Sequence, residues 1–332
     1  MKVAINGFGR IGRLVFRIMD NDPEFDIVAI NDLTDSKQLA HLLKYDTTHG
    51  KYKENDITYD DNNLIVSGKK IKVFAEKDPT NLPWKDLDID IVFECTGAFN
   101  SYDDSYKHIE AGAKKVLISA PAKGNLKTIV YNVNHGILDG TEQIVSASSC
   151  TTNCLAPVLK LINENFRIRK GYMTTIHAYT NDQEILDVSH KKGIESRRGR
   201  AGAVNIIPSS TGAATSIGKV IPELDGKMDG ISMRVPVQDG SVIDLTLETF
   251  ISATEDKINE IFKNSQNETL KYTEDPIVSS DVIGTDFGAL VDGLATKVLD
   301  TPTGQLIKII AWYDNEYGYS SQMVRVAKEM IK

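Results

Sequence analysis

The stretch KVAINGFGRIG, residues 2–12, decides the fold of the first part of the chain. Residues 2–6 form a short apolar run that predicts a β-strand, and the glycines that follow have the spacing GxGxxG. In a strand–turn–helix context, Gly7 allows a tight turn, Gly9 lets a pyrophosphate approach the backbone, and Gly12 lets the helix pack on the strand. The helix is indicated by apolar residues on one face, Leu14, Val15, Ile18 and Met19. The stretch therefore predicts a dinucleotide-binding unit.

A second apolar run, residues 25–30, predicts the next strand and ends shortly before Asp32. Asp32 follows Gly12 by about 20 residues, the spacing at which an acidic side chain accepts hydrogen bonds from the adenine-side ribose of a dinucleotide. A carboxylate in that place would repel a 2′-phosphate, so the sequence favours NAD over NADP. The alternative is that Asp32 caps a helix or completes a turn.

Three further strand-like runs follow, at residues 70–74, 90–95 and 115–119. They alternate with helical segments such as 103–111, which predicts a Rossmann-type α/β domain with a doubly wound, mainly parallel sheet covered on both faces. Such sheets bind ligands at the carboxyl ends of their strands, where Thr96-Gly97 and Ser119-Ala120-Pro121 lie. We assign both segments to the cofactor crevice, although ordinary turn chemistry explains them almost as well.

The second half of the chain has a different pattern, with longer strand-like runs at 171–178, 228–237, 241–250 and 305–312. Helices are indicated at 255–264 and at the end of the chain, where Val324, Ala327 and Ile331 fall on one face. The polar connection 238–240 suggests two strands joined by a tight turn. We therefore predict an α+β catalytic domain with a mainly antiparallel sheet and helices against one face, and a boundary near residues 148–150.

At that boundary the stretch SASSCTTNCLAP, residues 146–157, predicts a strand end, a tight connection and a helix that begins near Cys150. Free N–H groups and the positive end of the helix dipole would favour a thiolate, which makes Cys150 a candidate nucleophile. The hydroxyls of Ser149, Thr151 and Thr152 would suit a bound phosphate. The alternative is a small buried cysteine beside a helix cap. The three cysteines show no metal-ligand or disulfide pattern, so no metal is expected.

Of the six histidines, only His177 stands at the end of a strongly predicted strand and before a polar loop. A cysteine at a helix start and a histidine at a strand end fit a thiolate–imidazole pair, while a structural role is the alternative for this histidine taken alone. Arg234 lies inside an apolar strand and needs an anionic partner, either a local carboxylate or a substrate phosphate. The turn 209–214 offers hydroxyls and amides together.

Composition limits the classes of protein that fit. The 332 residues, of which 41% are apolar and 25% charged, fit two globular domains, each with its own core. Three cysteines fit a reducing compartment, and we find neither a secretory signal nor a run of apolar residues long enough to span a membrane, so we expect a cytoplasmic protein. A formal net charge of -8 argues against general nucleic-acid binding, although basic residues cluster between residues 191 and 200.

Motifs along the whole chain closely resemble the phosphorylating glyceraldehyde-3-phosphate dehydrogenase family. They are INGFGRIGR (5–13), NDLTD (31–35), SAP (119–121), SCTTNCLAP (149–157), HAYT (177–180) and WYDNEYGY (312–319). The resemblance implies that glyceraldehyde 3-phosphate and inorganic phosphate are converted with NAD to 1,3-bisphosphoglycerate. Cys150 would form a thiohemiacetal and then a thioester, and its backbone N–H would stabilise the oxyanion. His177 would raise the thiolate population and act as general base.

The resemblance also implies which residues hold the ligands. For the phosphate of the substrate it indicates Thr180 and Arg234. For the attacking phosphate it indicates Ser149, Thr151, Thr211 and Gly212, with Arg198 as a further contributor. For NAD it adds Arg10, Ile11, Lys77, Ser119 and Asn315 to the three glycines and Asp32.

The family's architecture implies a NAD-binding domain over residues 1–149, completed by the C-terminal helix at about 316–332, and a catalytic domain over 150–315. It also implies a homotetramer in which the loop 179–203 lies at a subunit interface, which would account for the basic cluster. The sequence departs from the family pattern at Val188-Ser189, where many members have Leu-Pro, and at Gly202, where alanine is common. Ser189 would relax the bias against NADP.

Three alternatives follow from the same residues. Erythrose-4-phosphate dehydrogenase uses the same thiolate and histidine and is the nearest other activity. A binding role as the main function is the second, and the acidic net charge weighs against nucleic acid as its partner. The third is thiol redox sensing by Cys150, which we expect as a side property.

Overall fold

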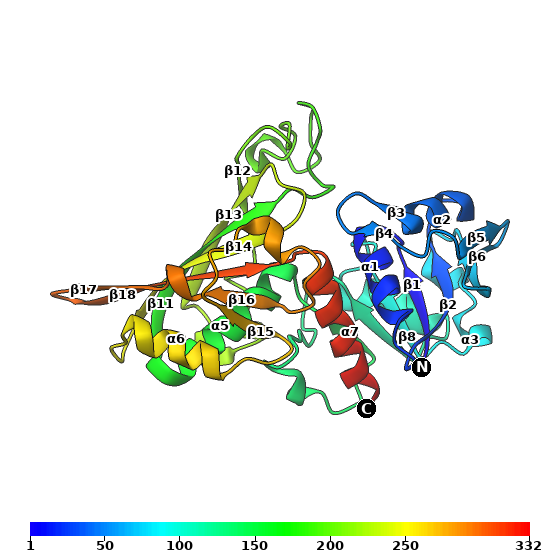
Figure 1. Cartoon of the computed structure of the whole chain (residues 1–332). Helices are drawn as coiled ribbons and strands as arrows, with labels where there is room; N and C mark the ends of the chain where they lie inside the picture. The colour runs from blue at the N-terminus through cyan, green and yellow to red at the C-terminus, as the bar shows by residue number, and fades with distance from the viewer. The chain divides into compact units, whose positions relative to one another are not determined.

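The computed structural model describes all residues from Met1 to Lys332. The chain forms two compact units, and neither is continuous in sequence. The first unit comprises Met1–Ile129, His135–Ser149 and Ser320–Lys332, and the second comprises Val130–Asn134 and Cys150–Tyr319. Figure 1 traces the chain through both units by residue number.

The first unit is built on an eight-stranded sheet in the order β10-β9-β8-β1-β2-β7-β6-β5. Six strands pair in parallel: β1 (Lys2–Asn6), β2 (Asp26–Asn31), β7 (Lys69–Phe74), β8 (Ile91–Glu94), β9 (Lys115–Ile118) and β10 (Ile144–Ser146). β5 (Ile57–Asp60) and β6 (Asn63–Val66) extend one edge in antiparallel fashion. The strand order reverses direction at β1, so the prediction of a doubly wound parallel sheet is confirmed.

Helices cover this sheet through their apolar faces. They are α1 (Arg10–Met19), α2 (Ser36–Lys44), α3 (Trp84–Leu87) and α4 (Tyr102–Glu110), with a small ribbon of β3 (Tyr45–Asp46) and β4 (Gly50–Lys51) beside them. α2 begins where the Asp35 side chain accepts a hydrogen bond from the Gln38 N–H, and α4 begins with the equivalent bond from the Asp104 N–H to Ser101. These caps satisfy N–H groups that the helices leave without partners.

The last helix, α7 (Tyr317–Ile331), contributes its residues from Ser320 onward to the first unit. Lys328 joins it to the start of β2, with its Nζ 2.6 Å from the Asp22 carboxylate and 2.5 Å from that of Glu24. Of the three apolar residues that share one face of the helix, Val324 and Ala327 are buried and Ile331 is exposed. Met323, Val326 and Met330 are also buried.

The second unit contains another eight-stranded sheet, in the order β12-β13-β11-β14-β18-β16-β15 with β17 beside β18. Its strands are β11 (Ile168–Ala178), β12 (Ile207–Ser210), β13 (Met228–Val235), β14 (Ser241–Thr249), β15 (Leu270–Thr273), β16 (Ala289–Asp292), β17 (Lys297–Thr301) and β18 (Gly304–Tyr313). Five of its pairings are antiparallel and two are parallel. The predicted mainly antiparallel sheet is confirmed.

The prediction that a tight turn joins β13 and β14 is wrong. These strands do not pair with each other: β13 runs parallel to β11 on one side, and β14 runs antiparallel to it on the other. The connection 236–240 therefore crosses the end of β11. It spans two inter-strand spacings of roughly 4.8 Å each, which needs more residues than a two-residue hairpin turn provides.

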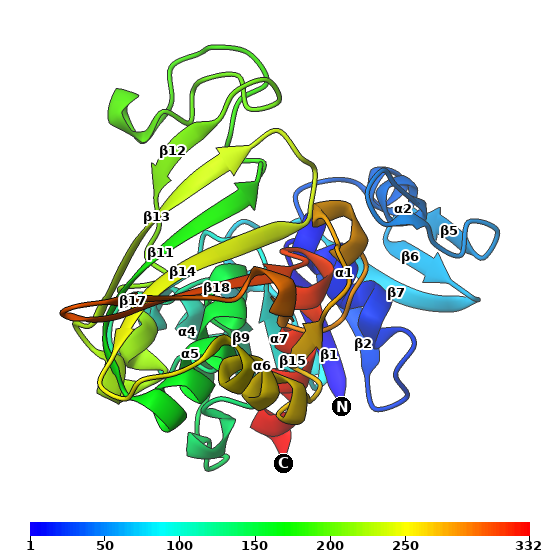
Figure 2. The same ribbon diagram turned by 60° about the vertical axis from the view of Figure 1, so that its left-hand side comes forward.

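α5 (Cys150–Phe166) and α6 (Glu255–Asn264) pack on this sheet, and Figure 2 shows both on the same side of it. α5 is buried along Cys154, Leu155, Val158, Leu159 and Ile162, which meet fully buried sheet residues such as Ile243, Leu245 and Ile309. The core therefore holds the start of α5 firmly against β11, β14 and β18. No helix in the chain combines the length and the apolar character that crossing a membrane requires.

The packing of α1 on β1 gives a prediction. A Cβ at Gly12 would lie 2.1 Å from the Gly7 carbonyl oxygen, and this backbone atom has no freedom to move away. Gly12→Ala should therefore lower the free energy of unfolding by about 2 kcal/mol or more, as overpacking does. Urea denaturation followed by circular dichroism measures this. An unchanged midpoint would mean that the helix does not approach the turn as closely as described.

Candidate functional site

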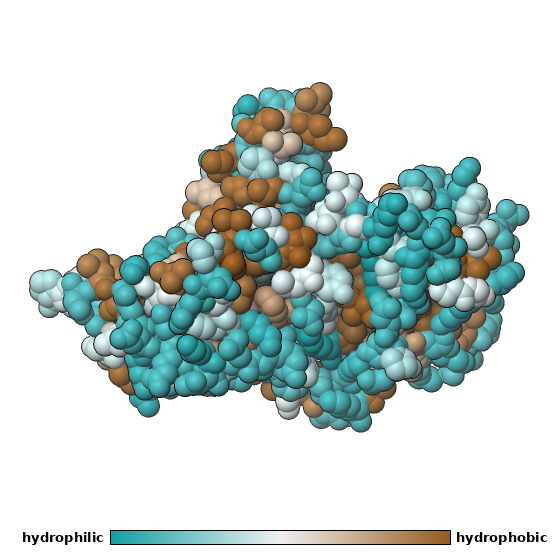
Figure 3. All heavy atoms as spheres, in the orientation of Figure 1, coloured by the Kyte–Doolittle hydropathy of each residue, from teal (hydrophilic) through white to brown (hydrophobic).

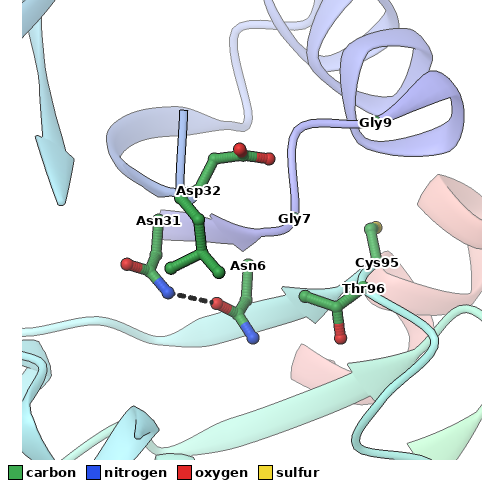
Figure 4. A pocket seen from close by; sticks show the side chains of 8 residues that line it. Asn6, Gly7, Gly9, Asn31, Asp32, Cys95 and Thr96 are labelled. Carbon is green, nitrogen blue, oxygen red and sulfur yellow. Dashed lines mark hydrogen bonds between the residues drawn. The ribbon is translucent and has the colours of Figure 1, made fainter. Parts of the chain in front are cut away.

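A cavity of about 330 Å³ opens in the first unit at the carboxyl ends of β1, β2 and β8. This is the edge at which doubly wound sheets bind ligands. Figure 4 shows it from close by. Its lining consists of Asn6, Gly7, Gly9, Asn31, Asp32, Leu33, Cys95 and Thr96.

The glycine turn beside this cavity has one glycine that protein packing does not require. Gly7 has φ +89°, and a Cβ there would lie 2.8 Å from the Thr96 backbone nitrogen. A Cβ at Gly9 would meet no protein atom within 4 Å, although Gly9 is the N-cap of α1 and has no capping side chain. Open space at the start of a helix, where backbone N–H groups and the helix dipole attract anions, fits a pyrophosphate. The first unit thus has the features that a dinucleotide needs.

Arg10 and Ile11 are the first residues of α1, so their backbone N–H groups belong to this helix start. The Arg10 guanidinium is bound to Asp46, with its two nitrogens 2.8 Å and 3.2 Å from the two carboxylate oxygens. Its contribution to a pyrophosphate would therefore come from its backbone rather than from its side chain.

Asp32 stabilises a turn and also lines the cavity. Its Oδ2 accepts a hydrogen bond from the Phe8 N–H at 2.7 Å, and its Oδ1 accepts one from the Thr34 N–H at 3.0 Å. The carboxylate thus stabilises its own turn. Each oxygen keeps a further lone pair, and the residue lines the cavity, so a ribose hydroxyl can still donate to it.

The remaining predicted cofactor residues do not line the cavity. Lys77 is exposed shortly after β7, and Ser119 follows β9 with its N–H bound to the Glu94 carbonyl at 2.9 Å. Asn315 belongs to the second unit, where its Oδ1 accepts a hydrogen bond from the Ser241 hydroxyl at 2.5 Å. Sequence analysis missed Asn6 and Asn31, whose signal was a polar residue closing an otherwise apolar strand.

In the second unit Cys150 is the first residue of α5 and is partly buried. The preceding Ser148 has φ +62°, a left-handed conformation that turns the chain sharply into the helix. The Cys150 Sγ lies 3.4 Å from Nε2 of His177, which stands near the end of β11. The Sγ is also 3.9 Å from the Thr151 hydroxyl.

The other ring nitrogen of His177 has two neighbours. Nδ1 is 2.7 Å from the Ala178 carbonyl oxygen and 2.9 Å from a guanidinium nitrogen of Arg234. A carbonyl only accepts and a guanidinium only donates, so the two contacts require different tautomers. With the proton on Nδ1, the shorter bond forms and the Nε2 lone pair faces the sulfur, while Arg234 keeps its own 3.0 Å bond to the same carbonyl.

Burial affects the pKa of both Cys150 and His177. Burial raises the pKa of the Cys150 thiol, and the opposing effects of Arg234 and Thr151 do not offset it. Burial and then the positive charge of Arg234 lower the pKa of His177 to about 3. Burial therefore disfavours both the thiolate form of Cys150 and the imidazolium form of His177.

Basic and hydroxyl groups gather beside His177. Arg234 lies 3.3 Å from the Thr180 hydroxyl, which donates to Asp182 at 2.5 Å. Arg198 pairs with the same aspartate and donates to the Ser209 hydroxyl at 3.1 Å. The Arg234 Nε is buried without a hydrogen-bond partner, which suits an anion supplied from outside the chain. The arrangement can hold a phosphate next to the reacting sulfur.

The other predicted phosphate residues lie in two places. Ser149 directly precedes Cys150, and the buried Thr151 hydroxyl is 2.9 Å from that of Tyr313. Thr211 and Gly212 follow β12 in a turn where a Cβ at Gly212 would meet nothing within 4 Å. Tyr313 is a site residue that sequence analysis missed: its ring packs edge-on against the His177 ring, with centroids 5.9 Å apart.

Comparisons with known proteins cover both units. Residues 1–102 match the family model "Glyceraldehyde 3-phosphate dehydrogenase, NAD binding domain", and residues 149–315 match "Glyceraldehyde 3-phosphate dehydrogenase, C-terminal domain". The glyceraldehyde-3-phosphate dehydrogenases of Clostridium pasteurianum and Clostridium acetobutylicum are 54% and 55% identical over 331 residues. That of Streptococcus pyogenes is 51% identical over 333 residues. Each alignment covers 100% of this chain and 98% of the relative.

The glycine turn gives a second prediction. Gly9 has φ -71°, which alanine adopts without strain, and its Cβ would project into open space. Gly9→Ala should therefore keep the stability of the parent protein but weaken NAD binding by about tenfold or more, because the methyl group occupies the path of the pyrophosphate. Calorimetric titration with NAD measures the change. Unaltered affinity in this variant would remove the turn from the cofactor site.

Proposed function

Because the chain belongs to the glyceraldehyde-3-phosphate dehydrogenase family, we propose that Cys150 and His177 carry out its NAD-dependent, phosphorylating oxidation of glyceraldehyde 3-phosphate to 1,3-bisphosphoglycerate. The observation that carries this assignment is the 3.4 Å contact between the Cys150 Sγ and the His177 Nε2. A nucleophile at a helix start with a base in hydrogen-bond reach is the arrangement that covalent catalysis requires.

We propose that the first step begins with a neutral Cys150 thiol and a neutral His177 imidazole. As the sulfur attacks the aldehyde carbon, its proton passes to the His177 Nε2, and the hydrogen bond from Nδ1 to Ala178 keeps the ring in the orientation that accepts it. The aldehyde oxygen becomes an oxyanion. The imidazolium and the backbone N–H of Cys150, which has no partner inside α5, stabilise that charge until the proton returns to give a thiohemiacetal.

Oxidation then removes the hydroxyl proton of the thiohemiacetal, and His177 accepts it as general base. Bound NAD supplies the hydride acceptor for this step. We assign its pyrophosphate to Gly7, Gly9, Arg10, Ile11 and Gly12, and its adenine-side ribose to Asp32. The proposed NAD site also includes Lys77 on the adenine side and Ser119 on the nicotinamide side. It further includes Asn315, which we assign to the nicotinamide carboxamide.

The product of oxidation is a thioester on Cys150, which phosphate cleaves. A phosphate oxygen attacks the carbonyl carbon, the thiolate leaves, and the proton on His177 returns to the sulfur. We assign the phosphate of the substrate to Thr180 and Arg234. The attacking phosphate we assign to Ser149, Thr151, Thr211 and Gly212, with Arg198. A thioester suits this exchange because it stays reactive enough for phosphate to attack, so the energy of oxidation is kept in the acyl phosphate.

We further propose that the protein works as a homotetramer in the cytoplasm. The loop between β11 and β12 exposes large apolar side chains to an unusual degree, with Ile185 83% and Ile194 86% exposed. Leu186, Val204 and Ile206 are also more than half exposed. Figure 3 shows apolar atoms gathered over this loop, and such gatherings mark protein interfaces. Three free cysteines support a reducing compartment.

A direct assay tests the proposed chemistry. The protein is given glyceraldehyde 3-phosphate and NAD with and without inorganic phosphate, and the ultraviolet absorbance of NADH is followed. We expect sustained NADH production only with phosphate, and much slower production from erythrose 4-phosphate. Cys150→Ser should reduce kcat by about four orders of magnitude or more while NAD binding stays within a few-fold, because the sulfur is the nucleophile.

Cys154→Ser is the matched control for that variant. Cys154 is one helical turn further along α5, fully buried and 3.8 Å from the Ala311 carbonyl, so its loss should affect stability rather than chemistry. Activity that survives in Cys150→Ser, or NAD binding lost in parallel with turnover, would contradict the assignment.

Arg234→Ala tests the phosphate site. The variant should lower kcat/KM for glyceraldehyde 3-phosphate by roughly 100-fold, because a charged hydrogen bond to a phosphate is lost. Unphosphorylated glyceraldehyde should be affected far less. Arg169→Ala, at the opposite end of the catalytic strand β11, is the control and should behave as the parent protein. Equal losses on the two aldehydes would exclude Arg234 from binding the substrate's phosphate.

A further inference from the structure

A buried polar network lies in the first unit and involves residues to which the proposed reaction assigns no role. Its centre is Glu94, the last residue of β8, which is 1% exposed. Around it lie His108 of α4 and Trp84 of α3, both fully buried, and Asn6 and Thr96 of the cavity wall. No lysine or arginine bonds to this carboxylate.

The groups at the two ends of this network determine the direction of each hydrogen bond within it. The Trp84 indole N–H can only donate, and it lies 3.0 Å from the His108 Nδ1, so Nδ1 accepts. The neutral imidazole therefore carries its proton on Nε2, which lies 3.2 Å from the Glu94 Oε2 and donates to it.

The amide orientations of Asn31 and Asn6 follow from the backbone group at the other end of the network. The Glu76 backbone N–H donates to Asn31 Oδ1 at 2.8 Å, which identifies the oxygen of that amide. The Asn31 amide nitrogen then donates to Asn6 Oδ1 at 2.7 Å, the bond drawn in Figure 4. The Asn6 nitrogen must consequently face Glu94, and it lies 2.5 Å from Oε2. Glu94 Oε2 thus accepts from both His108 and Asn6.

The second oxygen of Glu94 holds Thr96. Oε1 accepts the Thr96 backbone N–H at 2.8 Å and also the Thr96 hydroxyl. Thr96 is the residue against which Gly7 packs, since a Cβ at Gly7 would lie 2.8 Å from its backbone nitrogen and from its Cγ2. One carboxylate therefore holds two cavity residues, Asn6 and Thr96, and through Thr96 supports the glycine turn.

We propose that Glu94 is a positioning residue for dinucleotide binding. It preorganises the cavity wall by accepting three hydrogen bonds from Asn6 and Thr96, and a fourth from His108. The inference rests on the proposed function, because it assumes that the cavity binds the phosphate-bearing middle of NAD beside Gly7. A wall whose amide and hydroxyl groups already have partners needs no reordering when the ligand arrives. Glu94 itself does not line the cavity.

Glu94→Gln tests this proposal because glutamine has the same shape but only one acceptor oxygen. Its amide nitrogen would face N–H donors that now bond to a carboxylate oxygen, so at least one of the four bonds would be lost. We expect the Kd for NAD, measured by calorimetric titration, to rise about tenfold, while kcat at saturating NAD changes less than threefold. This split between affinity and turnover is the result that a purely structural role would not produce.

Trp84→Phe is the matched control, since it removes only the donor at the far end of the network and retains an aromatic ring. We expect its Kd for NAD to stay within threefold of the parent protein even where its melting temperature falls as much as that of Glu94→Gln. Equal weakening of NAD binding in both variants, or an unchanged Kd in Glu94→Gln, would overturn the proposal.

If Glu94→Gln does not fold, Thr96→Val replaces it. Valine keeps the Cγ2 that faces Gly7 and removes the hydroxyl, which donates to Glu94 and accepts the Ala98 N–H at 3.0 Å. The Kd should rise about threefold or more, and an unchanged value would overturn the proposal. The titration requires no turnover and can be repeated in Cys150→Ser. A parent protein that does not bind NAD would contradict the proposed function, whereas NAD binding that is indifferent to Glu94 contradicts this inference alone.

Discussion

The contact between the Cys150 sulfur and the His177 imidazole is the interaction on which the proposed chemistry depends. Cys150 begins a helix of 17 residues and His177 belongs to a strand of 11 residues, so the packing of α5 on its sheet determines their 3.4 Å separation. Burial disfavours the charged form of both groups, so the proposed attack on the aldehyde includes proton transfer from the sulfur to the imidazole. Arg234 links this pair to the proposed phosphate site, because it contacts both His177 and Thr180.

Local sequence patterns predicted much of the fold and the cofactor turn. The glycine spacing and the apolar run before it specify β1, the turn and α1, and each of these depends on neighbours in sequence. Strands with continuous apolar runs predicted a parallel sheet, and longer strands predicted the mainly antiparallel one. Asp32 was identified by its distance from Gly12, yet its two bonds to turn N–H groups show that spacing alone does not separate a structural carboxylate from a ligand-binding one.

Features that depend on tertiary packing could not be predicted in this way. The sequence places Cys150 and His177 27 positions apart, and only the fold shows that their side chains meet. Burial raises the pKa of the Cys150 thiol, and a sequence pattern that recognises a helix start does not reveal this burial. The connection between β13 and β14 looks like a hairpin because local turn chemistry does not reveal that β11 lies between the strands. Glu94, finally, ends a short apolar strand and carries no motif.

The divided first unit has a consequence for biosynthesis. Residues 320–332 belong to this unit, and Lys328 ties them to the carboxylates of Asp22 and Glu24, near the opposite end of the chain. The first unit therefore cannot complete its core until residues 320–332 have left the ribosome. A nascent chain that has only passed Ser149 lacks this part of the core.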